Sequence, residues 1–352
     1  MRSVLITGGC GFVGSNLAIL FKRKYPSYNI SCLDNLKRRG SEINIPRLLE
    51  FGVKYIHGDV RNKEDLQGIT DIDCIIDASA EPSVLAGQEG NTDFIINTNL
   101  SGTVNCLDLA VKNKADFIYL STSRVYPVNS IEQINFIEKE TRFEIDNKQN
   151  ISGVTKKGIS ENFPLQGYRS LYGATKLSSE LIIEEFREIF RLKTVINRCG
   201  IIAGPYQMGK IDQGVIALWV ASHFWKRELS YIGYGGCGKQ VRDVLYVDDL
   251  FNLIDIQVHK MNKHNGQIYN IGGGNFNVSL KELTDICEEI TGNKITIKKD
   301  AVSRKADVRI YITDNSKITE SSDWLPYTPV KETVSHIFKW IKSDENRLKL
   351  IL

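Results

Sequence analysis

The first 34 residues contain the feature that most restricts how this chain can fold. An apolar run at residues 3–7 leads directly into the glycine-rich segment 8–14, and an amphipathic stretch then precedes a second apolar run that ends at Asp34. The glycines let the backbone turn tightly and approach a pyrophosphate at a helix N-terminus, where free N–H groups favour an anion. A carboxylate about 20 residues beyond the last glycine is placed to bind the adenosine ribose of NAD. This strand–turn–helix–strand order predicts a dinucleotide site.

The composition is that of an ordinary soluble globular protein. Of the 352 residues, 42% are hydrophobic and 25% are charged, and the net charge is +3, so we expect one large or two medium domains. The basic cluster Lys37, Arg38 and Arg39 is typical of a solvated loop, which argues against a nucleic-acid partner. No apolar run reaches membrane-spanning length and the N-terminus lacks the pattern of a signal peptide, so we expect no membrane partner.

The cysteines and histidines favour a reduced protein without a metal. The seven cysteines are scattered and form no C-x-x-C pair, and several lie inside apolar runs. Scattered cysteines inside apolar runs are usually small buried residues with free thiols. We therefore expect a cytoplasmic protein. The five histidines are equally scattered, and we predict no metal site.

Strand-like and helix-like segments alternate along the chain. Strands are expected at residues 53–57, 74–78, 117–120, 194–198 and 267–271, and helices at residues 98–112, 171–190, 213–225, 279–291 and 330–342. This alternation predicts an α/β fold, a doubly wound parallel sheet of the Rossmann type with a smaller C-terminal α/β domain for the substrate. Ligands of such sheets bind beyond the carboxyl ends of the strands.

The expected domain boundaries follow from where the pattern becomes irregular. We assign residues 1–200 to the dinucleotide-binding domain, with 241–273 returning to it, and residues 201–240 and 274–352 to the substrate domain. The long polar segment 127–170 has weak periodicity, and its role stays open.

A tyrosine and a lysine at helical spacing open the expected helix 171–190. Tyr172 and Lys176 lie at i and i+4, on one helix face. A nearby ammonium favours the phenolate, which lowers a tyrosine pKa from about 10 toward the value that a general base needs. The same spacing occurs at Tyr206/Lys210 and Tyr327/Lys331, but glycine or proline inside those segments disfavours a helix.

Hydroxyl side chains end the expected strand at residues 117–120. Ser121, Thr122 and Ser123 follow it directly. They can cap the strand end, or Thr122 can hydrogen-bond the substrate hydroxyl that Tyr172 deprotonates. The residues alone leave both interpretations open.

Taken together, these motifs resemble the extended short-chain dehydrogenase/reductases, in their sugar-nucleotide epimerase/dehydratase branch. The similarity spans nearly the whole chain. It is carried by Thr7-Gly8-Gly9-x-Gly11-Phe12-x-Gly14, His57-Gly58-Asp59-Val60, Asn97-x-Asn99-x-x-Gly102-Thr103, Tyr172-x-x-x-Lys176, Gly204-Pro205 and Arg242-Asp243-Val244-x-x-Val247-x-Asp249.

The resemblance implies a role for each matching residue. Thr122, Tyr172 and Lys176 would be catalytic, and Thr122, Gln213, Arg242 and Arg309 would bind the substrate, the two arginines through its pyrophosphate. Asp59 and Val60 would contact the adenine, Ser79 and Ala80 the central part of the cofactor, and Asn99 would support that side of the site. The full set expected at the cofactor is Gly8, Gly11, Phe12, Val13, Gly14, Asp34, Asn35, Asp59, Val60, Ser79, Ala80, Asn99, Ser121, Tyr172, Lys176 and Cys199.

Differences from the family patterns limit which of the family's reactions the resemblance implies. The 4,6-dehydratases carry an Asp-Glu pair after the threonine, and this chain has Ser123 and Arg124 there, so dehydration is disfavoured. The chain is similar to the CDP-tyvelose epimerase (CDP-paratose 2-epimerase) group, through Gly238–Leu245 and Asp323-Trp324 among other stretches. This resemblance implies NAD-dependent epimerisation at C2 of a CDP-hexose by transient oxidation to a 2-ketone.

Three other functions stay open at this point. They are a different nucleotide-sugar epimerase such as a UDP-hexose 4-epimerase, a net NAD(P)H-dependent reductase, and a non-catalytic dinucleotide-binding sensor or scaffold. NAD is favoured over NADP because Asp34 would repel a 2′-phosphate, although Lys37, Arg38 and Arg39 follow closely. The resemblance also implies a homodimer or homotetramer paired through the helices at 98–112 and 171–190.

Overall fold

The computed structural model describes residues 2–88, 90–209, 213–304 and 306–352, and the chain divides into two compact units. The first unit consists of Met1–Val125, Leu171–Arg198 and Leu250–Tyr269. The second unit consists of Tyr126–Ser170, Cys199–Asp249 and Asn270–Leu352.

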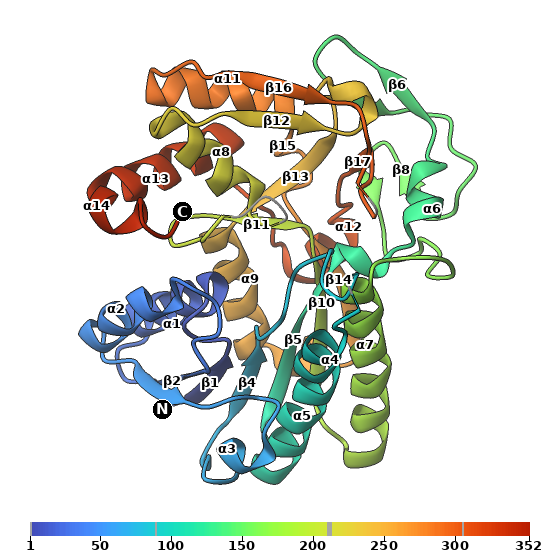
Figure 1. The fold of residues 1–352 in the computed structure, drawn as a ribbon. Coiled ribbons are helices and arrows are strands. Elements are labelled where there is room, and N and C mark those ends of the chain that lie inside the picture. Colours follow the sequence, from blue (N-terminus) through green and yellow to red (C-terminus); the bar gives the residue numbers. More distant parts are fainter. Residues whose placement is uncertain (1, 89, 210–212, 305) are drawn as a thin grey trace. The chain divides into compact units, whose positions relative to one another are not determined.

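A seven-stranded sheet with the order β14-β10-β5-β4-β1-β2-β3 forms the centre of the first unit (Figure 1). Its strands are β1 (Ser3–Thr7), β2 (Asn29–Asp34), β3 (Lys54–His57), β4 (Cys74–Asp77), β5 (Asp116–Thr122), β10 (Thr194–Cys199) and β14 (Gln267–Ile271). The pairs β1–β2, β2–β3, β1–β4 and β4–β5 are parallel, and their register places Thr7 beside both Leu33 and Asp77. The carboxyl ends of these strands therefore meet at one edge.

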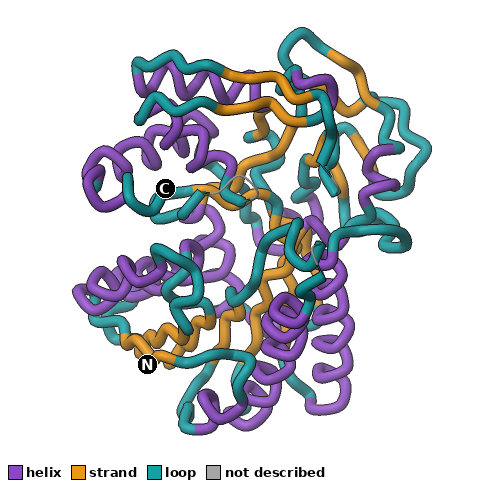
Figure 2. Tube along the Cα trace, in the orientation of Figure 1, coloured by secondary structure: helices purple, strands orange, loops and turns teal. Residues whose placement is uncertain are grey.

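Helices cover both faces of this sheet (Figures 1 and 2). On one face lie α1 (Phe12–Lys24), α2 (Asn44–Glu50) and α9 (Val247–His259), and on the other lie α3 (Lys63–Gln67), α4 (Asp93–Ile96), α5 (Gly102–Asn113) and α7 (Leu171–Phe190). Apolar strand residues such as Leu5, Ile75 and Phe117 pack against Leu107 of α5 and Ile183 of α7. The predicted doubly wound parallel sheet is confirmed.

The helix expected at residues 98–112 begins differently from the prediction. Residues Asn97–Ser101 form a π-helical turn, η2, and the α-helix α5 starts only at Gly102. The helix α7 has the predicted bounds.

Apart from the hairpins of residues 127–170, the described part of the second unit contains two small sheets and a group of helices. One sheet contains β11 (Ile201–Ala203), β13 (Val241–Tyr246), β15 (Asn277–Ser279) and β17 (Ile310–Tyr311), and the other pairs β12 (Leu229–Ile232) with β16 (Ile297–Asp300). Helices α8 (Val215–Phe224), α11 (Leu280–Thr291) and α13 (Val330–Ser343) pack on one another. Three further short helices are α10 (Met261–His264), in the first unit, and α12 (Ser316–Ser322) and α14 (Glu345–Leu348), in the second.

The segment 127–170 belongs to the second unit rather than to a domain that spans residues 1–200. It contains α6 (Val128–Glu132) and two hairpins, β6 (Phe136–Glu138) with β7 (Phe143–Ile145) and β8 (Val154–Thr155) with β9 (Gly158–Ile159). The backbone N–H of Phe143 donates to Lys239 O at 3.0 Å, and that of Ile159 donates to Ile312 O at 2.8 Å. These bonds join the segment to the second unit.

The part of the chain that returns to the first unit is also shorter than expected. It comprises Leu250–Tyr269 instead of residues 241–273, because β13 pairs with β11, β15 and β17 of the second unit.

Across the described ranges, every helix is too short or too polar to cross a bilayer. These described residues contain no cluster of three or more His, Cys, Asp or Glu that could hold a metal ion.

Candidate functional site

The turn between β1 and α1 forms a glycine-lined cradle. Gly8 has a φ of +62°, and a Cβ there would lie 2.8 Å from Ala78 O, while a Cβ on Gly14 would collide with Gly8 O. Helix α1 begins at Phe12 directly after Gly11, with no side-chain cap and no acid in its first turn. The N-cap residue Gly11 therefore has no side chain that could occupy the N–H groups at the start of α1, which suits a pyrophosphate.

Asp34 ends β2 beside this turn. Its carboxylate accepts hydrogen bonds from Cys10 N at 2.9 Å and from Leu36 N at 2.8 Å. Burial raises the pKa of Asp34 above its ordinary value, and the backbone hydrogen bonds act against that rise. The carboxylate is thus fixed next to the glycine turn, where it can accept a ribose hydroxyl.

A second carboxylate, Asp59, follows β3. Arg61 binds it through Nε at 3.0 and 3.1 Å and through a terminal nitrogen at 2.6 Å, and Asn35 Nδ2 donates to it at 2.8 Å. Partial burial acts to raise the pKa of Asp59, but the hydrogen bonds from Arg61 and Asn35 outweigh it and bring the pKa to about 2. Val60, the next residue, packs against Gly102, where a Cβ would lie 2.7 Å from its side chain.

Asp77, a buried acid at the end of β4, was not predicted as a site residue from the sequence. It has no exposed surface and accepts hydrogen bonds from the hydroxyls of Thr7 at 2.7 Å, Ser79 at 2.7 Å and Thr103 at 3.0 Å. It therefore fixes the loop that holds Ser79 and Ala80. An acid inside the apolar run 74–78 was the available signal, since carboxylates are almost never fully buried unless they are paired.

Asn99 lies in the π-helical turn and joins two parts of the site. Its Oδ1 accepts from Glu81 N at 2.8 Å, and its Nδ2 donates to Glu81 O and to Thr175 Oγ1, both at 3.1 Å. Thr175 lies between Tyr172 and Lys176 on α7. The fully buried Asn99 thus connects the loop after β4 to the helix that carries the tyrosine–lysine pair.

Tyr172 is the second residue of α7 and Lys176 follows one turn later. Lys176 is only 2% exposed, and its Nζ lies 4.0 Å from the centre of the Tyr119 ring on β5. A cation over an aromatic face is stabilised there. On the same strand, Thr122 is buried and its Oγ1 accepts from Arg124 N at 3.2 Å. The structure thus brings Lys176 of α7 against the strand that ends at Thr122.

Neither of the other two tyrosines that have a lysine four residues later, Tyr206 and Tyr327, lies in a helix. Tyr327 precedes α13, which starts at Val330, so Tyr327 and Lys331 share no helix. Tyr206 is in a turn, and Lys210 lies outside the described residues.

Beneath Thr122, a buried ion pair joins α7 to the sheet. Glu180 receives hydrogen bonds from Arg198 Nε at 3.2 and 3.0 Å and from its Nη2 at 2.7 Å. The hydroxyl of Ser121 donates to the same carboxylate. The sequence pattern did not identify Glu180 or Arg198.

Four of the predicted site residues belong to the second unit: Cys199, Gln213, Arg242 and Arg309. Cys199 is buried at the end of β10, and Gln213 is half-buried just before α8. The other predicted residues all belong to the first unit.

The two arginines are neighbours within the second unit, since Arg242 Nη1 lies 3.4 Å from Arg309 O. Arg242 forms an ion pair with Asp307 at 2.8 Å and Arg309 one with Glu132 at 3.6 Å. The Arg309 guanidinium also lies over the rings of Phe136 at 4.1 Å, Tyr234 at 5.1 Å and Phe143 at 5.6 Å. Both cations are therefore held in place by partners of their own unit.

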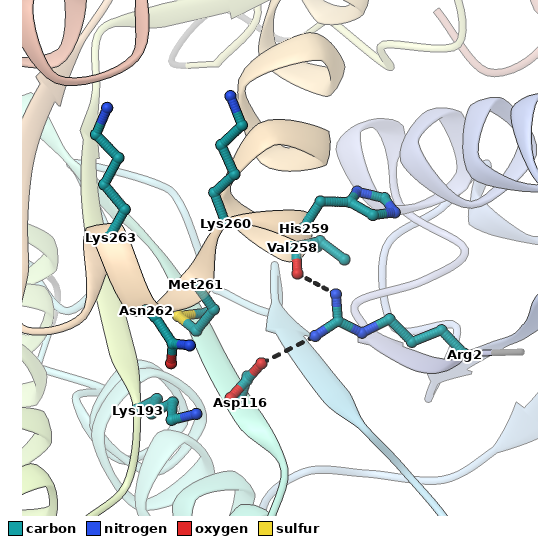
Figure 3. A pocket seen from close by; sticks show the side chains of 9 residues that line it. All are labelled: Arg2, Asp116, Lys193, Val258, His259, Lys260, Met261, Asn262 and Lys263. Carbon is teal, nitrogen blue, oxygen red and sulfur yellow. Dashed lines mark hydrogen bonds and ion pairs between the residues drawn. The ribbon is translucent and has the colours of Figure 1, made fainter.

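A cavity of about 360 Å³ lies elsewhere in the first unit (Figure 3). Arg2 spans it, donating to Val258 O and to Asp116 at 3.1 Å. Arg2 precedes β1 and Asp116 starts β5, so this cavity lies at the amino edge of the sheet, opposite the glycine turn.

At the carboxyl edge, the first unit combines what a dinucleotide-dependent oxidation needs. The glycine cradle, Asp34 and Asp59 suit the pyrophosphate and the adenosine half of a dinucleotide, and the Tyr172–Lys176 pair on α7 suits proton transfer at a substrate hydroxyl. The residues present fit NAD.

Comparison with known proteins gives the same result. A curated relative, the CDP-paratose 2-epimerase of Salmonella typhi, is 32% identical over 356 residues, covering 97% of this chain and 99% of that protein. The putative UDP-glucose 4-epimerase of Methanocaldococcus jannaschii is 28% identical and covers 97% and 99%. Among solved structures, the NAD complex of dTDP-glucose 4,6-dehydratase from Bacillus anthracis has a TM-score of 0.78 at 26% identity and covers both chains completely.

The match to a known family spans most of the chain. Residues 4–272 match the NAD dependent epimerase/dehydratase family. The chain therefore belongs to this family, and its cofactor is NAD.

Proposed function

We propose that the protein epimerises C2 of the hexose in a CDP-sugar of the paratose/tyvelose type. The observation that carries the proposal is the Tyr172–Lys176 pair on α7, with Lys176 held against β5 next to the strand end that bears Thr122. The choice of C2 and of a CDP-sugar is supported by the similarity to the Salmonella typhi enzyme over nearly the full length of both chains.

The residues of the first unit divide the chemistry among them. When bound, NAD supplies a hydride acceptor that returns the hydride, so that no net oxidation occurs. Tyr172 takes the proton of the C2 hydroxyl and gives it back once the sugar presents its other face, and Thr122 shares the hydrogen bond to that oxygen. Lys176 keeps the Tyr172 phenol acidic and binds the nicotinamide ribose, while Asp34 and Asp59 bind the adenosine half.

In this proposal, Arg242 and Arg309 bind the substrate pyrophosphate. A guanidinium carries five N–H donors in a planar fork. A single carboxylate cannot accept all five, so donors remain for a phosphate. The ion pairs with Asp307 and Glu132 would then orient the two guanidinium groups for the phosphates. Gln213, just before α8, is proposed as a further substrate-binding residue.

A substrate panel tests the proposal. Purified protein is incubated with CDP-paratose, CDP-glucose, UDP-glucose and UDP-galactose, and each sugar is followed by proton NMR. We expect inversion at C2 of a CDP-sugar without any added reductant. Conversion of the UDP-sugars alone, with inversion at C4, would contradict the proposal and indicate a UDP-hexose 4-epimerase. Stoichiometric consumption of NADH or NADPH would indicate a reductase.

Removing the Tyr172 hydroxyl tests its role as the acid–base group. A general base contributes about 10²- to 10⁴-fold to a rate, so we expect Tyr172→Phe to lower kcat by that factor and to leave NAD affinity unchanged. Tyr28→Phe is the matched control, because the Tyr28 hydroxyl contacts His259 at 2.8 Å, away from the carboxyl edge. Near-normal turnover of Tyr172→Phe would exclude the assigned role.

The pH dependence of NAD binding tests Asp34. Its carboxylate accepts a ribose hydroxyl best when ionised, and burial raises its pKa above the ordinary value. NAD affinity should therefore fall as the pH is lowered through this raised pKa. Asp59, with a pKa of about 2, stays ionised over that range.

The corresponding variant is Asp34→Asn, measured by calorimetry. The lost charge-assisted hydrogen bond should weaken NAD binding about 10-fold or more near neutral pH. The variant should also lose the acid-dependent fall. An unchanged pH profile in Asp34→Asn would show that another group causes the dependence.

We further propose that two copies of the chain pair through α5 and α7. Helix α7 carries three large exposed apolar side chains, Leu181 at 58%, Ile189 at 66% and Phe190 at 50%. Leu181 and Ile189 are eight residues apart, about two helical turns, so they lie toward the same side of α7, and exposed apolar side chains suit a two-fold interface.

Light scattering after size exclusion tests the pairing. We expect at least twice the mass of the 39.8 kDa chain, and Leu181→Arg should reduce it to one chain. Leu325→Arg is the control, because Leu325 is 60% exposed but lies outside α7. A single-chain mass for the natural protein would contradict the proposal.

A further inference from the structure

Three charged or polar residues lie one turn apart on α7. Tyr172, Lys176 and Glu180 occupy i, i+4 and i+8, so they follow one face of the helix. Lys176 contacts the Tyr119 ring of β5, and Glu180 contacts Ser121 of β5 and Arg198 of β10. One helix face is thus joined to two strands by contacts that surround the proposed catalytic residues.

The Glu180–Arg198 pair is buried almost completely. The side chains are 2% and 4% exposed, and their closest N–O distance is 2.7 Å. Replacing a buried ion pair with well-packed apolar residues is often neutral or stabilising. Stability alone therefore gives a weak reason for two charges at this position.

Geometry gives a stronger reason. Arg198 approaches the carboxylate through Nε and a terminal nitrogen, and such two-point contacts fix direction as well as distance. The Ser121 hydroxyl donates a hydrogen bond to the same carboxylate, and Ser121 directly precedes Thr122 in the chain. Rotation or sliding of α7 would break these contacts, so they hold Tyr172 and Lys176 in register with Thr122.

We infer that Glu180, through its contacts with Arg198 and Ser121, is a positioning residue that aligns Tyr172 and Lys176 of α7 with Thr122 of β5. The inference rests on the proposed function, in which these three residues carry the chemistry. Neither Glu180 nor Arg198 itself contacts the reacting atoms in this account.

The chain offers a matched control on the same strand. Asn197, next to Arg198 on β10, exchanges two hydrogen bonds of 2.8 Å with Gln257 of α9, and both side chains are fully buried. Adjacent strand residues point to opposite faces of the sheet. Gln257→Leu therefore disrupts a buried polar pair of the first unit on the face away from α7.

The test compares Glu180→Gln with Gln257→Leu in thermal stability, kcat and KM. A misplacement of about 1 Å costs on the order of 10²-fold in rate, so we expect Glu180→Gln to lower kcat at least about 10-fold with KM within about threefold. Gln257→Leu should lower the melting temperature but keep kcat within about twofold. If Glu180→Gln keeps kcat within twofold, or if the two variants lose kcat equally, the positioning role is wrong.

A double variant covers the case in which Glu180→Gln does not fold. Glu180→Leu/Arg198→Met removes both charges and leaves no unpaired ion in the interior, so it should fold. We expect the same loss of kcat as in Glu180→Gln. Turnover within twofold of the natural protein in this folded variant would overturn the inference.

NAD affinity separates this inference from the proposed function. If the natural protein converts none of the nucleotide sugars, the proposed function fails. The effect of Glu180→Gln on NAD affinity then tests the positioning role of Glu180 by itself. Displacement of Lys176 should then weaken NAD binding at least about fivefold in Glu180→Gln and not in Gln257→Leu. Equal affinity in the natural protein and Glu180→Gln would refute the alignment of α7.

Discussion

Parallel strands in one sheet all end at the same edge, and this constraint determines where the functional groups of the first unit lie. The register that pairs Thr7 with Leu33 and Asp77 places the glycine turn after β1, Asp34 at the end of β2 and Ser79 after β4 at that edge. Thr122, at the end of β5, comes there for the same reason. Residues more than a hundred positions apart are thereby collected without any long loop to carry them.

Collecting these groups places several charges in the interior, and each of them is satisfied by more than one partner. Asp77 accepts from three hydroxyls, Asp34 from two backbone N–H groups, and Glu180 from Arg198 and Ser121. An unpaired buried charge costs several kcal/mol, so these partners make such an arrangement stable. They also make it rigid, which suits proton transfer at a fixed distance.

The parts of the site that were predictable from the sequence are those that local chemistry determines. The glycine turn, Asp34 and the bounds of α7 follow from patterns within about 30 neighbouring residues. The predicted helix at residues 279–291 is also a local pattern, since Ser279 and Glu282, three residues apart, form a capping box at the start of α11. The π-helical turn around Asn99 was not predictable from local sequence, because Asn99 exchanges hydrogen bonds with Glu81 and donates one to Thr175, which are 18 and 76 positions away.

The contacts that could not be predicted join residues that are far apart in the sequence. Ser121 and Glu180 are 59 residues apart and become partners only once α7 lies on β5. The hairpins of residues 127–170 have strands of two or three residues, too short to show a period. Bonds to distant residues such as Lys239 and Ile312 join them to the second unit.

In the proposed mechanism the inverted carbon is oxidised and then reduced with the same hydride, and isotope tracing in D₂O distinguishes this route from deprotonation at carbon. The protein is incubated with CDP-paratose in D₂O, and the product is examined by proton NMR at C2. We expect a 2-epimer that retains protium at C2, because the hydride never exchanges with solvent. Deuterium at the inverted carbon would mean that the carbon itself is deprotonated, and it would contradict the roles assigned to NAD and Tyr172.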